Sequence, residues 1–190
     1  MFYLDDIYYR KRLAHHIRQE GYAERWNATD LKVREHVTVD DYIKSVRTPT
    51  IREWLELRKM ISLARNMEPD WLASIKYSIL MFGRGEGGAP HTHGPFIMLP
   101  IGQQVSPSTL VHEKMHVYQR YHPIETTLEF SKQYPITGFE YPDMNQRANP
   151  DTTRILFGDI RPVYAPDALK LFDITDRRDH PNELQAYSVH

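Results

Sequence analysis

Apolar side chains recur at helical spacing in two stretches of the first 70 residues. Residues 4–19 mix apolar and basic positions at a loosely helical period, and Gly21 is a plausible stop. A second helix is predicted from about residue 51 to about residue 66, because Thr50 and Glu53 fit a capping box. Its apolar positions keep the 3.6-residue period: Ile51, Trp54, Leu55, Leu57, Met60, Ile61 and Leu63. Residues 1–70 are therefore predicted to be mainly helical.

After residue 70 the pattern changes to the alternation of a strand. Residues 74–82 place every second apolar side chain on one side: Ile75, Tyr77, Ile79 and Met81. The glycine-rich segment 83–90 cannot continue that strand and predicts a turn. A second apolar run, 95–101, is bounded by Pro95 and Pro100, which favours the edge of a sheet.

Two further helices complete the predicted architecture. One runs from Leu110 to about Tyr121, and the last begins at Pro181. The prediction is one α+β domain over residues 1–190, with N-terminal helices and a small mixed sheet. Residues 71–190 would contain the sheet and both later helices.

Composition narrows the possible functions. The 190 residues fit one domain, and 24 Lys plus Arg against 25 Asp plus Glu argue against whole-protein attraction to nucleic acid or anionic membranes. The chain has no cysteine, so any metal site must use His, Asp or Glu. No apolar run approaches the roughly 20 residues of a membrane span, and the first 12 residues lack the features of a signal peptide. We therefore expect an intracellular location.

The strongest chemical signal is His112-Glu113-Lys114-Met115-His116 within the predicted helix 110–121. Histidines four residues apart project from one helix face, and their imidazoles can reach one ion at about 2.0–2.1 Å. Glu113 can approach a metal-bound water and take its proton as that water attacks a carbonyl. Composition alone predicts only about 0.03 chance matches to this motif. The alternative is a surface helix with two incidental histidines.

This segment resembles the active-site helix of the zincin metallopeptidases. The resemblance implies Zn²⁺ as cofactor, a peptide or protein substrate and peptide-bond hydrolysis. Lys114 departs from the family, which usually has an uncharged residue there. Because Lys114 lies about 200° around the helix from His112, it can reach solvent if that face is open.

Two residues are candidates for a third ligand. His122 falls where a longer zincin motif places its third histidine, but Gln119 stands where that motif needs a glycine for a sharp turn. Glu183, in His180-Pro181-Asn182-Glu183, resembles the second-helix glutamate of the gluzincins, the thermolysin-like branch. That resemblance implies a zinc set of His112, His116 and Glu183. Otherwise Glu183 is a first-turn glutamate that favours the helix dipole.

Zincins also need a donor that stabilises the oxyanion, commonly a Tyr or His. Tyr164 and Tyr187 are the catalytic candidates, and Tyr141 and His190 remain open. Tyr187 lies one turn beyond Glu183, within reach of the site.

Other features near the motif allow two interpretations each. The run 95–100 could be the edge strand along which zincins bind extended peptide, over the zinc helix, or an ordinary strand. His91 and His93 could hold a second metal, although loop histidines are more often exposed. Asn149 or Asp151 could orient the zinc histidines or form a plain turn.

The sequence allows three functions. The first is zinc-dependent peptide-bond hydrolysis. The second is a zincin-fold binding or structural component without proteolysis, with which Lys114 and the small size of the chain are compatible. Over about residues 95–190, the order zinc helix, R-x-N-P-D-T, H-P-x-E-x-x-A-Y resembles uncharacterised zincin-like proteins of large DNA viruses, which makes a virion location an alternative. The third is nucleic-acid binding through residues 8–12 (YYRKR), although such a cluster more often lies on a solvated helix face. Oligomeric state and cleavage preference have no sequence signal.

Overall fold

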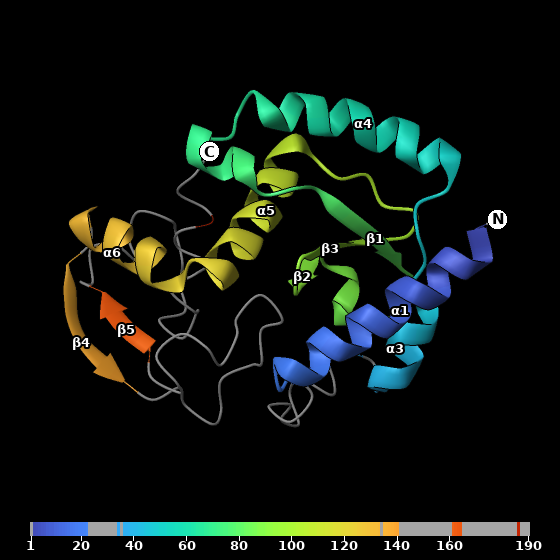
Figure 1. Cartoon of the computed structure of the whole chain (residues 1–190), viewed down its shortest axis with the longest axis horizontal. Helices are drawn as coiled ribbons and strands as arrows, with labels where there is room; N and C mark the ends of the chain where they lie inside the picture. Colours follow the sequence, from blue (N-terminus) through green and yellow to red (C-terminus); the bar gives the residue numbers. More distant parts are fainter. Residues whose placement is uncertain are drawn as a thin grey trace.

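The computed structural model describes residues 2–22, 34, 36–133, 135–140, 161–164 and 186 (Figure 1). The α+β class is confirmed. The elements in chain order are α1 (Phe2–Gln19), α3 (Val39–Ser45), α4 (Ile51–Arg65), the 3₁₀ helix η2 (Asp70–Ser74), β1 (Ser78–Phe82), the 3₁₀ helix η3 (Glu86–Gly88), β2 (His91–His93), β3 (Phe96–Pro100), α5 (Pro107–Tyr121), α6 (Pro123–Gln133), β4 (Ile136–Glu140) and β5 (Arg161–Tyr164).

Side-chain caps define where the two main helices begin. The Thr50 hydroxyl accepts from the Glu53 N–H, and the Glu53 carboxylate accepts from the Thr50 N–H, so the predicted capping box of α4 is confirmed. Helix α5 starts three residues earlier than predicted. Its N-cap Ser106 accepts from a backbone N–H in the first turn, and Pro107 occupies the first helical position.

The main sheet has three strands in the order β1-β3-β2. Strand β1 is parallel to β3, and β2 is antiparallel to it. The placement of the run 95–101 at a sheet edge is therefore wrong, since β3 is the central strand. The reason is that Pro95 precedes β3 and Pro100 ends it, so neither proline removes an N–H from the strand interior. Strands β4 and β5 form a separate antiparallel pair.

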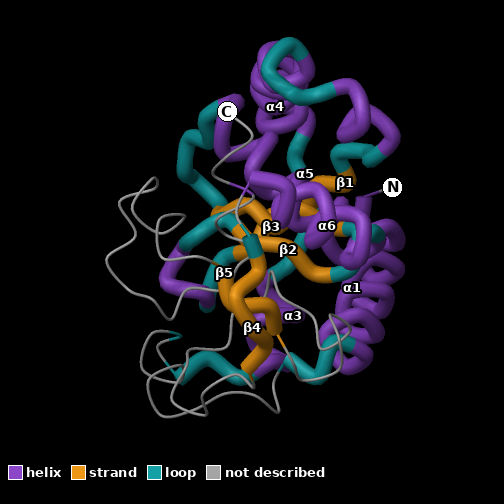
Figure 2. The backbone as a smooth tube through the Cα atoms, turned by 90° about the vertical axis from the view of Figure 1, so that its left-hand side faces the viewer, coloured by secondary structure: helices purple, strands orange, loops and turns teal. Residues whose placement is uncertain are grey.

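The sheet separates two apolar clusters, and strand alternation decides which residue enters which cluster. Toward α4 and α5 lie Ile79, Met81, Ile97 and Leu99, as the alternation in residues 74–82 predicts. Toward α1 and α3 lie Leu80, Phe82, Phe96 and Met98. Figures 1 and 2 show the resulting layers, with α4 and α5 on one side of the strands and α1 and α3 on the other. Among the described residues, no helix is long and apolar enough to cross a membrane.

Candidate metal centre

The two histidines of the motif converge on one point. The His112 Nε2 and His116 Nε2 atoms lie 3.0 Å apart, with ring planes at 85°. Two nitrogens bound at 2.0–2.1 Å to one tetrahedral ion would lie about 3.3 Å apart, so a shift of a few tenths of an ångström would accommodate zinc. His116 is fully buried and His112 is half-buried. Glu113, next to His112 in the chain, is also buried.

The helix face that carries Lys114 is not open to solvent. Its side chain is buried, and Nζ donates to Glu68 Oε2 at 2.6 Å while lying 4.6 Å from the Tyr77 ring centre. The reason is that α4 and η2 cover this side of α5, and Glu68 lies in the connection between them. A buried ammonium needs a charged partner, and Glu68 supplies it. The positive charge of Lys114 is therefore balanced by a carboxylate from the segment that follows α4.

His122 is held away from the histidine pair. It is the C-cap of α5, and its ring stacks on Tyr118 with centroids 4.3 Å apart. Tyr118 lies about 200° around the helix from His116. This geometry agrees with the expectation that His122 is not the third ligand.

Several predicted site residues lie outside the described residues: Tyr141, Asn149, Asp151, Glu183, Tyr187 and His190. Tyr164 is the last residue of β5, and its side chain also falls outside the description. Ala186, three positions after Glu183, is helical and fully buried in the cluster that contains Leu110 and Val111 of α5. Within the described ranges, no group of three or more His, Cys, Asp or Glu side chains could hold a metal.

His91 and His93 are buried rather than exposed, which corrects the expectation for a loop pair. They form strand β2, which contacts α1. His91 Nδ1 lies 2.9 Å from the Ala89 carbonyl, and its Nε2 lies 2.6 Å from the Tyr42 hydroxyl. His93 Nδ1 donates to Glu20 Oε2 at 2.8 Å. No local sequence pattern predicts this cluster, because Tyr42 lies 49 residues from His91 and Glu20 lies 73 residues from His93 in the chain.

The edge of β2 that does not pair with β3 faces α5. Arg120 lies one turn beyond His116 on the same helix face, and its guanidinium donates to the Gly94 carbonyl at 2.8 Å and to the Thr92 hydroxyl at 2.9 Å. The Glu20 carboxylate accepts from the Gly94 N–H at 2.6 Å and lies 3.3 Å from Arg120 Nε. An edge strand does lie beside α5, but it is β2 instead of the predicted run 95–100.

Part of the basic segment 8–12 packs inside the fold. Arg10 Nε donates to the Val46 carbonyl at 2.6 Å, and Tyr9 packs edge-on against Phe96. Arg12 lies over the same Phe96 ring, 5.5 Å from its centre. Tyr9 and Arg10 are thus half-buried, whereas Tyr8, Lys11 and Arg12 are exposed.

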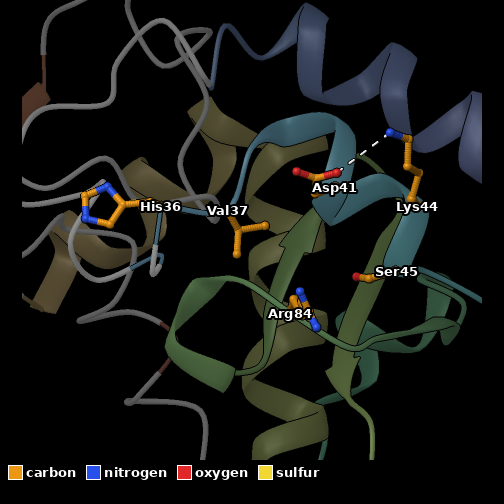
Figure 3. A pocket seen from close by; sticks show the side chains of 6 residues that line it. All are labelled: His36, Val37, Asp41, Lys44, Ser45 and Arg84. Carbon is orange, nitrogen blue, oxygen red and sulfur yellow. Dashed lines mark ion pairs between the residues drawn. The ribbon is translucent and has the colours of Figure 1, made fainter.

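A surface hollow lies apart from the histidine pair. Figure 3 shows its lining, which contains the Asp41–Lys44 ion pair but no residue of α5: His36, Val37, Asp41, Lys44, Ser45 and Arg84. The converging histidines are a better guide to chemistry here than this hollow, because they carry metal-binding atoms.

Comparison of the chain with protein-family models, curated proteins and solved structures found no match. Functional inference therefore rests on the residues themselves.

Proposed function

We propose that this protein is a zinc-dependent hydrolase of peptide bonds. The observation that carries the proposal is the convergence of His112 Nε2 and His116 Nε2 to 3.0 Å on a helix that begins at a capped, proline-initiated turn. Both atoms are suitable zinc ligands at this spacing. Bound zinc would supply a water of lowered pKa and polarise the scissile carbonyl. Glu113 would accept the proton of that water, and Tyr164 or Tyr187 would donate to the developing oxyanion.

Glu183 is proposed as the third protein ligand. The support comes from Ala186, which is helical and buried in the same apolar cluster as the α5 residues Leu110 and Val111. A residue three positions earlier on the same helix would lie on a neighbouring part of one face. Glu183→Ala should therefore weaken zinc affinity strongly, whereas His122→Ala should leave it nearly unchanged.

The direct test is elemental analysis and peptide cleavage with wild type and Glu113→Gln. Wild type should carry one zinc per chain and cleave unstructured peptides. Glu113→Gln should retain zinc and lose cleavage, because an amide of nearly the same shape cannot accept the proton. Zinc-free wild type would refute the metal site, and full turnover in Glu113→Gln would remove this glutamate from the mechanism.

The second candidate function is a zinc-binding component without proteolysis, located for instance in a virus particle. One observation favours it. Arg120 donates to the Thr92 carbonyl of β2, and Arg120 and Glu20 bond the carbonyl and N–H of Gly94 directly after it, where an extended peptide would otherwise pair. Zinc-loaded wild type and a folded Arg120→Ala variant would then both fail to cleave a peptide library. Cleavage by either protein would favour the hydrolase.

A further inference from the structure

We infer that Gln119 positions His116 for metal binding by fixing which ring nitrogen carries the proton. Gln119 is fully buried, and its Oε1 lies 2.9 Å from His116 Nδ1. An amide oxygen only accepts hydrogen bonds, so this contact requires a proton on Nδ1. A neutral imidazole with Nδ1–H presents its lone pair at Nε2. That is the atom 3.0 Å from His112 Nε2.

The spacing makes the contact local to α5. Gln119 follows His116 by three residues, so both side chains lie on neighbouring rows of one helix face. Gln119, which stands where the longer zincin motif has its glycine, therefore acts on His116. It holds the ring plane and the tautomer of the second ligand before any metal arrives.

The inference rests on the proposed zinc site and deepens it. Removing a partner that orients a metal-binding histidine typically costs 10–100-fold in metal affinity. Gln119→Leu keeps a side chain of similar length but removes the acceptor. Gln119→Glu keeps an acceptor for the Nδ1 proton, so it should rescue. Met115→Leu is the matched control, because Met115 is buried on the same helix and its replacement conserves volume.

The experiment measures zinc affinity by competition with a chromophoric chelator for the wild type and these three variants. Nitrogen-15 NMR of the metal-free proteins reports the His116 tautomer alongside. Gln119→Leu should bind zinc 10–100-fold more weakly and lose the uniform Nδ1–H tautomer, while Gln119→Glu and Met115→Leu stay within about threefold of wild type. Equal zinc affinity in wild type and folded Gln119→Leu would overturn the inference and leave the zinc site standing.

The two failures are distinguishable. If the wild type binds no zinc, the proposed function fails. The His116 tautomer in the metal-free protein still tests whether Gln119 fixes the proton on Nδ1. In that case a metal-free His116 that carries its proton on Nε2 would overturn the inference. If Gln119→Leu does not fold, the wild-type and Gln119→Glu spectra decide, because both must show the Nδ1–H form.

Discussion

His91 and His93 lie two residues apart on strand β2, whereas His112 and His116 lie four apart on helix α5. Each spacing puts two imidazoles on one face of its element. In the strand pair the ring centroids are 5.4 Å apart, and the nitrogens of His91 are used by the Tyr42 hydroxyl and the Ala89 carbonyl. In the helix pair the two Nε2 atoms point at each other across 3.0 Å.

The surroundings of the two pairs differ in charge. The strand pair lies in a buried network in which Glu20 bonds His93 and pairs with Arg120. Nearby, Arg34 pairs with Glu86. The Nδ1 of His116, by contrast, meets the uncharged amide of Gln119. Spacing brings histidines together, but the partners of their nitrogens decide whether the pair stabilises a fold or offers lone pairs to a metal.

The largest expected effect is a loss of zinc when the helix pair His112 and His116 is changed, but not when the strand pair His91 and His93 is changed. His116→Ala should lower zinc affinity by well over 100-fold, more than the loss of an orienting partner does, because one of three ligands disappears. His93→Gln should keep one zinc per chain, since its amide can still donate to Glu20. Elemental analysis of folded protein, checked by circular dichroism, makes the comparison. Zinc loss in a folded His93→Gln variant would show that the strand pair belongs to the metal site.

Local features were predictable from the sequence, and long-range pairings were not. The capping box of α4, the alternation of β1 and the histidine face of α5 depend on residues within one or two turns. The sequence pattern does not predict helix α6, because Pro123 is as typical of the end of one helix as of the first turn of the next.

Two features near the site depend on partners that the local pattern does not show. The run 95–101 lies at the centre of the sheet because β2, a three-residue strand directly before it, pairs with its second edge. Strand β2 is too short for alternation to identify it. Lys114 pairs with Glu68, which lies 46 residues earlier in the chain, and periodicity does not identify so distant a partner.

The next effect concerns the free energy of unfolding and tests the Lys114–Glu68 pair, on the side of α5 away from His112. Lys114→Met should lower the free energy of unfolding by about 3 kcal/mol, because it leaves the Glu68 carboxylate buried without its cation. Adding Glu68→Gln should restore a large part of that loss. Zinc content should not change in either variant, since Lys114 lies about 200° from His112. Urea unfolding of the metal-free proteins measures the loss. A double variant no more stable than Lys114→Met would argue against a coupled pair.

The smallest effect tests the strand pair through pH. Burial alone would raise the pKa of Glu20, but the hydrogen bond from His93 and the charge of Arg120 outweigh it and hold that pKa below its ordinary value of 4.5. The unfolded chain therefore binds the Glu20 proton more readily, so this contribution to stability is present above about pH 4.5 and is lost as the pH falls further. Glu20→Gln should be less stable than wild type by about 1–2 kcal/mol at pH 7. That difference should hold down to about pH 5 and narrow below about pH 4.5, because the amide does not titrate. Urea unfolding at pH 7, 5 and 3.5 measures it, with Glu56→Gln as control because Glu56 forms an exposed pair with Lys59. A difference that stays constant across this range would mean that Glu20 does not stabilise the strand pair through its charge.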